Sequence, residues 1–240
     1  MQVYALKIEY SRFRNESILN TRDLRALVLK FIDENSEYFR ICNWHGKGIP
    51  RVIYSKPRNS FATVYTTLSD VADYLAEKIK KRFVWIDDKR IAVKGVKRYN
   101  LKWEVGKLTD KLYMYQTRTE IITGVNDTEW KINTAVKNMG SIEGLEKDVL
   151  KNIITRTVKH AYKNWFGFEP DLSELQIKVM DGKHFLCPYK VDVLLPSWRG
   201  IFLSNYSLPQ FVGYKTGLGY GELQLKAELP KSRLEKILVA

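Results

Sequence analysis

The sequence predicts an α+β protein built from two similar halves. Strand-like alternation and helix-like apolar stripes follow one another in a similar order in residues 1–108 and in residues 109–240. Apolar residues make up 45% of the chain, as in globular proteins, and no low-complexity linker separates the halves. We therefore expect two tandem ferredoxin-like (RRM-like) domains that pack directly, with a junction near residues 106–110.

The first half alternates strand and helix patterns. Residues 2–10 and 51–55 alternate like strands, and residues 90–105 predict a strand or a bent hairpin. Asn20 is placed to cap a helix that ends near residues 34–35 and whose apolar face is Leu24, Leu27, Val28, Phe31 and Ile32. Ser69-Asp70 is expected to cap a second helix, with an apolar face of Val71, Ala72, Leu75, Ile79 and Phe83.

The second half repeats that order. A strand is expected over residues 112–122, followed by a helical region from about 131 to 165 that is broken near Gly140 and Gly144. Its later apolar stripe is Leu145, Val149, Ile153, Ile154, Val158, Ala161 and Trp165. Further strands are expected at residues 175–180, 189–195 and 223–227, with a turn at residues 181–184 and a short helix at 207–211.

The charge balance points to a polyanionic partner. The formal net charge is +13, with 40 Lys and Arg against 27 Asp and Glu, which favours nucleic acid first and an anionic membrane surface second. No apolar run reaches the roughly 20 residues that span a bilayer, and the N-terminus lacks a signal peptide, so we expect a cytoplasmic protein. The two cysteines, Cys42 and Cys187, are too few for a zinc framework.

The most distinctive motif is a glycine-rich segment, residues 212–223, that leads into the last expected strand. Nucleotide-binding glycine loops open a helix, so neither a Walker loop nor a dinucleotide fingerprint fits here. A basic, glycine-rich hairpin that lies against a phosphate backbone fits better. The alternative is a mobile surface hairpin.

The duplicated ferredoxin-like order and the Gly213–Gly221 motif together resemble the RAMP superfamily of CRISPR-associated proteins. Within it the chain is similar to the sixth Cas family, whose members cut precursor CRISPR RNA. A histidine in the loop after the first long helix, here His45, is a second point of likeness. The resemblance implies metal-independent cleavage without a cofactor, in which the ribose 2′-hydroxyl attacks the adjacent phosphate and leaves a 2′,3′-cyclic phosphate or 3′-phosphate. It implies RNA, the CRISPR repeat transcript, as the partner; other effector subunits and a homodimer stay open.

That reaction needs a base, an acid and a cation, and His45 has the best neighbourhood for it. The hypothesis makes His45 the general base or acid, with Lys47 or Lys56 stabilising the phosphorane and Tyr54 orienting the 2′-hydroxyl or phosphate. The alternative is an ordinary exposed loop histidine. His160 is expected to be a surface or a packing histidine, and His184 is expected in a turn, as the next histidine to mutate.

RNA contacts are expected over a wider surface. Phosphate contacts are assigned to Lys215, Thr216 and the backbone amides of Gly217 and Gly219, while Tyr214 and Tyr220 either stack on bases or pin the loop to the sheet. The basic run over residues 78–102 is a further RNA-contacting region or only a solvated face. Within this run the residues expected to bind RNA are Lys94, Lys97 and Arg98. In and just after the 51–55 strand they are Arg51 and Arg58.

Two other functions compete with the nuclease. A non-catalytic RNA-binding subunit of a CRISPR effector complex shares the fold, the charge and the glycine loop. A DNA-binding or membrane-surface protein is supported by charge alone, because no basic amphipathic helix and no DNA-reading module is recognised.

Overall fold

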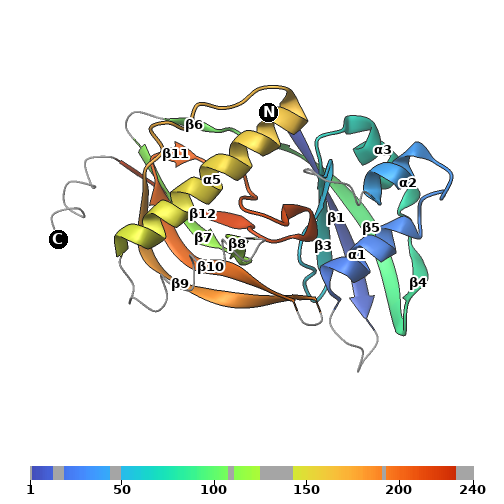
Figure 1. Cartoon of the computed structure of the whole chain (residues 1–240). Coiled ribbons are helices and arrows are strands. Elements are labelled where there is room, and N and C mark those ends of the chain that lie inside the picture. The colour runs from blue at the N-terminus through green and yellow to red at the C-terminus, as the bar shows by residue number, and fades with distance from the viewer. Residues whose placement is uncertain are drawn as a thin grey trace. The chain divides into compact units, whose positions relative to one another are not determined.

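The computed structural model describes residues 2–12, 19–43, 50–107, 111–124, 143–190 and 193–230, which form two compact units. Unit 1 consists of Met1–Trp103 together with Gly217–Gly219, and unit 2 of Glu104–Thr216 and Tyr220–Ala240. Figure 1 shows the elements of both units along the chain.

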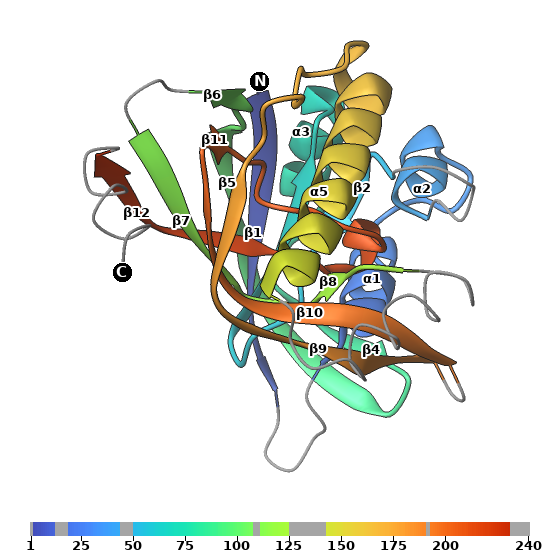
Figure 2. The same ribbon diagram turned by 60° about the vertical axis from the view of Figure 1, so that its left-hand side comes forward.

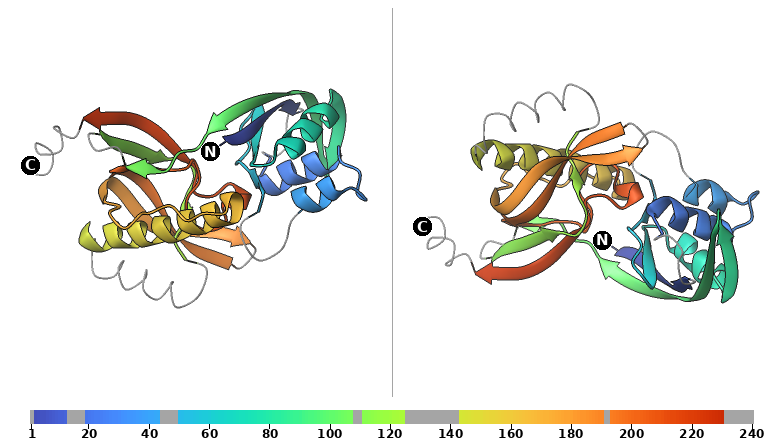
Figure 3. Two further views of the ribbon diagram at one scale, coloured as in Figure 1. Left: turned by 90° about the horizontal axis from the view of Figure 1, so that it is seen from above. Right: turned by 90° about the horizontal axis from the view of Figure 1, so that it is seen from below.

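Unit 1 is built on a five-stranded antiparallel sheet with the strand order β2-β3-β1-β5-β4. Helices α1 and α3 cover one face of this sheet (Figures 1 and 3). The elements are β1 (Gln2–Arg12), α1 (Thr21–Leu29), α2 (Glu37–Cys42), β2 (Val52–Tyr54), β3 (Phe61–Thr66), α3 (Ser69–Lys78), β4 (Arg82–Ile86) and β5 (Lys89–Lys102).

The strand alternation of β1 decides which face is buried beneath the helices. Leu6, Ile8 and Tyr10 point into the core that they share with α1 and α3, so Lys7 and Glu9 lie on the opposite face of the sheet. The α1 helix begins with a capping box, in which the Asn20 side chain accepts from the Asp23 backbone N–H at 2.9 Å and the Asp23 carboxylate accepts from the Asn20 N–H at 2.8 Å. The expected N-cap at Asn20 is confirmed.

Unit 2 carries a second antiparallel sheet, with the order β12-β7-β10-β8 and β9 paired along β10. A separate two-stranded ribbon joins β11 to β6. The elements are β6 (Gly106–Lys107), β7 (Lys111–Thr117), β8 (Ile121–Ile122), α5 (Glu143–Phe166), β9 (Ile177–Lys190), β10 (Val193–Ser204), β11 (Tyr206–Ser207), a 3₁₀ turn η1 (Thr216–Leu218) and β12 (Leu223–Pro230).

Helix α5 lies across the sheet of unit 2 (Figure 2). Its buried residues recur every three or four positions, so that one stripe of the helix faces the sheet. They include Leu150, Ile153, Ile154, Val158, Ala161 and Trp165. Most of the expected stripe is therefore confirmed, and with it the α+β architecture of two ferredoxin-like sheets.

Several local predictions are wrong. The expected turn at residues 181–184 lies inside β9, where Asp181 pairs with Ile201 and His184 with Trp198. The expected helix at 207–211 is absent from this described segment, which holds the end of β11 and a single β-bridge at Phe211. Phe83 is not on a helix but on β4 and is exposed. Two further elements, α2 and β3, were not expected from the sequence, and residues 131–142 of the expected helical region lie outside the described ranges.

Candidate functional site

The glycine-rich segment forms a loop whose two ends are joined. Phe211 and Glu222 form an antiparallel bridge, and the Val212 N–H donates to the Gly221 carbonyl at 3.0 Å. Beyond the loop the chain enters β12, which pairs with β7. The expected strand after the glycines is therefore confirmed, and the loop is held at its base by backbone hydrogen bonds.

Two glycines of this loop are explained by close packing of the chain on itself. Gly221 has φ +72°, and a Cβ there would overlap the carbonyl oxygen of Val212. Gly219 has φ +77°, and its Cβ would lie 2.5 Å from the Tyr54 carbonyl oxygen and 2.8 Å from the Lys56 nitrogen. Gly219 is buried against the end of β2. This burial does not fit the expectation that its backbone amide contacts a phosphate.

The two tyrosines of the loop have packing roles. Tyr214 and Tyr220 are partly buried against a small apolar cluster of Ile122, Cys187 and Leu195. Of the two roles left open by the sequence, the structure favours pinning the loop to the sheet over base stacking.

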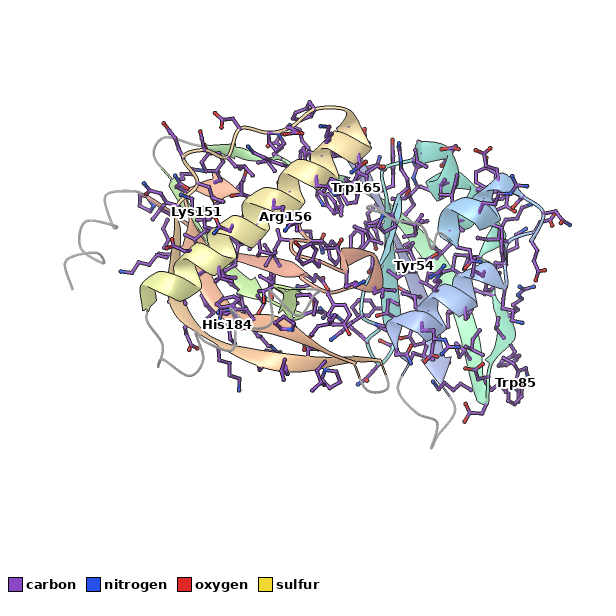
Figure 4. All side chains as sticks on the ribbon, viewed as in Figure 1. Tyr54, Trp85, Lys151, Arg156, Trp165 and His184 are labelled. Atoms are coloured by element: carbon purple, nitrogen blue, oxygen red, sulfur yellow. The ribbon has the colours of Figure 1, made fainter. Side chains whose placement is uncertain are left out.

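The loop is also tied to α5. The Gly213 N–H donates to the Thr157 hydroxyl at 3.0 Å, and the Arg156 guanidinium lies 5.6 Å from the centre of the Tyr214 ring. Thr157 in turn donates to the Ile153 carbonyl at 2.7 Å. Helix α5 therefore fixes the start of the loop in unit 2, and Figure 4 shows Arg156 on this helix.

The polar groups that this loop leaves accessible are few. Lys215 is exposed and adopts φ +59°, while Thr216 and Gly217 are half-buried in the 3₁₀ turn η1. Arg156 is an exposed cation beside the loop and was not among the residues expected to bind RNA. No sequence signal links Arg156 to the glycines, because their contact depends on the packing of α5 against the loop.

Tyr54 does not fit the catalytic role expected for it. Its side chain is 3% exposed, and its hydroxyl donates to the Cys42 carbonyl at 2.9 Å. Burial raises the pKa of Tyr54 well above its ordinary value, and it raises the pKa of the Cys42 thiol to about 12. The Tyr54 hydroxyl thus links β2 to α2, and its burial does not fit the expected role of orienting a 2′-hydroxyl.

The other residues expected near β2 divide into two groups. Arg51 and Arg58 are exposed, Lys56 is half-buried, and the Arg58 guanidinium lies 5.3 Å from the centre of the Phe61 ring. His45 and Lys47, the expected proton-transfer residue and its neighbouring cation, lie outside the described residues.

The expected basic residues of β5 are exposed, but two of them are ion-paired. Lys97 lies 3.2 Å from the Glu9 carboxylate. Arg98 pairs with Asp73 and stacks over Tyr4 at 4.7 Å. Lys94 is exposed on the same strand. Because Glu9 is opposite Phe61 in the β1–β3 register, Lys97 and Arg58 belong to the same face of the sheet, opposite α1 and α3.

The two other histidines have different surroundings. His160 is exposed on α5, one turn after Arg156, so that of its two expected positions, surface or packing, the structure has the surface. His184 is half-buried in β9, opposite Trp198, rather than in a turn (Figure 4). Within the described ranges, no three His, Cys, Asp or Glu side chains cluster as metal ligands would, and no helix there is long and apolar enough to cross a membrane.

No family model matches the sequence, and no curated protein matches it. Solved structures do match by fold. A crystal structure of Cas6b aligns with a TM-score of 0.66 at 18% identity, over 94% of this chain and 100% of that one. A crystal structure of the CRISPR RNA processing endoribonuclease Cas6b aligns with a TM-score of 0.59 at 19% identity, over the same shares.

A third solved structure, from work on a Cas6-related gene of Pyrococcus furiosus, aligns with a TM-score of 0.61 at 14% identity. It covers 93% of this chain and 98% of that one. These likenesses show that the chain has the Cas6 fold, as the resemblance seen in the sequence implied.

Proposed function

We propose that this chain is an endoribonuclease that cuts CRISPR repeat RNA without a metal ion. The observation that carries the proposal is the fold match along nearly the whole chain to a CRISPR RNA processing endoribonuclease. The net charge of +13 supports it, because a polyanionic substrate requires a surface that attracts phosphates.

The proposed reaction is attack of a ribose 2′-hydroxyl on its own 3′-phosphate. The 2′-oxygen bonds to phosphorus, the bond to the 5′-oxygen breaks, and the products are a 2′,3′-cyclic phosphate and a 5′-hydroxyl. One group must accept the 2′-hydroxyl proton, another must protonate the departing 5′-oxygen, and a cation must stabilise the phosphorane. His45 is assigned one of the proton transfers because an imidazole titrates near neutral pH.

The glycine loop supports His45 over the other histidines. Within unit 1, Gly217 lies against the Pro50 ring, and Gly219 lies against the backbone of Tyr54 and Lys56. His45 precedes Pro50 by five residues, which span at most about 18 Å when fully extended. The loop tip therefore lies against Pro50 and Lys56, and the proposal is that one bound phosphodiester contacts the loop tip, Lys56 and His45.

Lys56 is the described cation assigned to the phosphorane, with Lys47 as its alternative. Lys215, Thr216 and the neighbouring Arg156 are assigned to flanking phosphates, since they carry the accessible polar groups of the loop region.

The test is cleavage of end-labelled repeat RNA in EDTA under single-turnover conditions. Wild-type protein is expected to cut at one position and leave a cyclic phosphate, and His45→Ala to lose at least about 100-fold in rate, as removal of a general acid or base does. His160→Ala and His184→Ala are the matched controls and should cut at near the wild-type rate. An RNA that is shifted in a gel but stays intact would make the protein a binding subunit instead.

A further inference from the structure

The edge strand of the first sheet carries two large exposed aromatic side chains. Phe83 is 58% exposed and Trp85 is 60% exposed, although both belong to β4, a regular strand of the sheet. Their neighbours Val84 and Ile86 are buried in the core beneath α1. Because side chains alternate along a strand, Phe83 and Trp85 share the face of the sheet that α1 and α3 do not cover. Figure 4 shows Trp85 projecting outward from β4.

A cation lies beside these rings. In the β4–β5 register Arg90 is directly opposite Trp85, and its guanidinium lies 4.5 Å from the centre of the Phe83 ring. The same pairing of ring and cation recurs on this face of the sheet at β3, where the Lys7 amine lies 4.6 Å from the centre of the Phe61 ring. The face therefore combines flat apolar surfaces with positive charge.

The segment around these rings is also the most basic part of the chain. Residues 78–102 hold ten Lys and Arg against two Asp, an excess of +8 within a chain whose net charge is +13. Several of these cations pair with carboxylates from elsewhere in unit 1, namely Glu9, Asp23, Asp73 and Glu77. Even when those four carboxylates are counted in, the region keeps an excess of +4.

Charge and exposure together select the occupant. Two exposed aromatics on an edge strand would suit a second copy of the chain, but edge-to-edge pairing of β4 would bring two strongly positive regions together. Single-stranded RNA matches both features, since its phosphates pair with cations while its unstacked bases stack on aromatic faces.

We propose that Phe83, Trp85 and Arg90 form a stacking site for an unpaired segment of RNA. We name these three residues the β4 platform. This proposal rests on the proposed function, because the β4 platform would bind an unpaired segment of the same RNA that the protein cuts. The platform contains none of the residues assigned to cleavage. It holds bases flanking the cut and contributes to affinity, with Lys80 and Lys81 as exposed cations next to it in sequence.

The experiment measures binding of a short fluorescein-labelled oligouridylate by fluorescence anisotropy. Trp85→Ala should raise the Kd about ten-fold, the effect of losing one base–aromatic stack, while Trp85→Phe should keep the Kd within about three-fold of wild type. Met180→Ala and Leu225→Ala remove exposed apolar side chains elsewhere and should leave the Kd unchanged.

Salt dependence separates stacking from simple charge. Trp85→Ala should weaken binding at every salt concentration without changing the slope of log K against log salt, whereas Arg90→Ala should make that slope shallower. An unchanged Kd for Trp85→Ala overturns the proposal. If light scattering shows that wild-type protein is a dimer and that Trp85→Ala is a monomer with unchanged RNA affinity, the site binds a second copy of the chain, and the proposal is likewise overturned. Because oligouridylate binding does not depend on cleavage, a catalytically inactive protein that still shows the Trp85 effect refutes only the nuclease assignment.

Discussion

Replacing Gly221 by alanine tests whether the glycine loop is shaped by its own packing. At φ +72° an alanine pays about 1–2 kcal/mol for the left-handed backbone. Its Cβ would overlap the Val212 carbonyl oxygen and lie 2.9 Å from the Val212 carbonyl carbon, so the backbone must move. That movement breaks the 3.0 Å hydrogen bond from the Val212 N–H to the Gly221 carbonyl, at about 1 kcal/mol or more. We expect Gly221→Ala to lower the free energy of unfolding of unit 2 by about 3 kcal/mol.

Two other glycines of unit 2 provide matched controls. Gly167 also has a positive φ, +78°, but has no atom within 4 Å of its Cβ position, so Gly167→Ala should cost only about 1 kcal/mol. Gly106 has neither constraint, and Gly106→Ala should stay within about 0.5 kcal/mol of wild type. Urea denaturation followed by the fluorescence of tryptophans that include the fully buried Trp198 measures all three. A Gly221→Ala cost no greater than that of Gly167→Ala would refute the packing argument.

Three more predictions follow from the same geometry. Tyr54→Phe should lower the free energy of unfolding by about 1–2 kcal/mol, because the Cys42 carbonyl loses the hydroxyl that donates to it. RNA cleavage should persist in this variant. Loss of cleavage in a fully stable protein would restore Tyr54 to the active site. Burial raises the pKa of the Cys42 thiol from its ordinary value of 9.0 to about 12 in the folded protein. The stability that comes from keeping this thiol protonated is therefore complete below pH 9 and declines as the pH rises toward 12. By pH 10 unfolding should be easier by about 1 kcal/mol, and Cys42→Ala should flatten this dependence in urea titrations at pH 8 and 10; equal slopes would contradict the assignment. Lys215→Ala should reduce the slope of log K against log salt for RNA binding by about 0.7. The control is Lys111→Ala, which should leave the slope unchanged, because the Lys111 amine is paired with the Glu228 carboxylate at 2.7 Å. Equal slopes for Lys215→Ala and wild type would remove Lys215 from the phosphate contacts.

Local signals account for the parts of the fold that were predicted correctly. The α1 cap at Asn20 and the apolar stripe of α5 lie within one turn or one helix, so the sequence alone carries them. The alternation of β1 likewise reports its two faces directly. These short-range patterns were sufficient for the order of most elements and hence for the fold class.

Cross-strand contacts account for the errors. Asp181-Gly182 has the composition of a turn, but Gly182 stands opposite Gly200 in the β9–β10 register, and a Cβ on Gly182 would overlap the Trp198 ring. The glycine makes room for a tryptophan that is 16 residues away in sequence. Phe83 was placed on a helix face because its spacing continues the α3 stripe, although α3 ends at Lys78.

The candidate site shows the same division. The sequence singled out the glycine loop, but only tertiary packing reveals that Gly219 is buried, that Tyr54 bonds Cys42, and that Arg156 lies on Tyr214. Burial of a side chain far from its partner in sequence leaves no periodic signal.

The most direct test of the proposed chemistry replaces one atom of the substrate. Once the cut site is mapped, the ribose before it is changed to 2′-deoxyribose in otherwise identical repeat RNA. We expect unchanged binding affinity and no cleavage at that bond, because the attacking oxygen is missing. Cleavage of the deoxy substrate at the wild-type rate would contradict attack by the 2′-hydroxyl and require a different nucleophile.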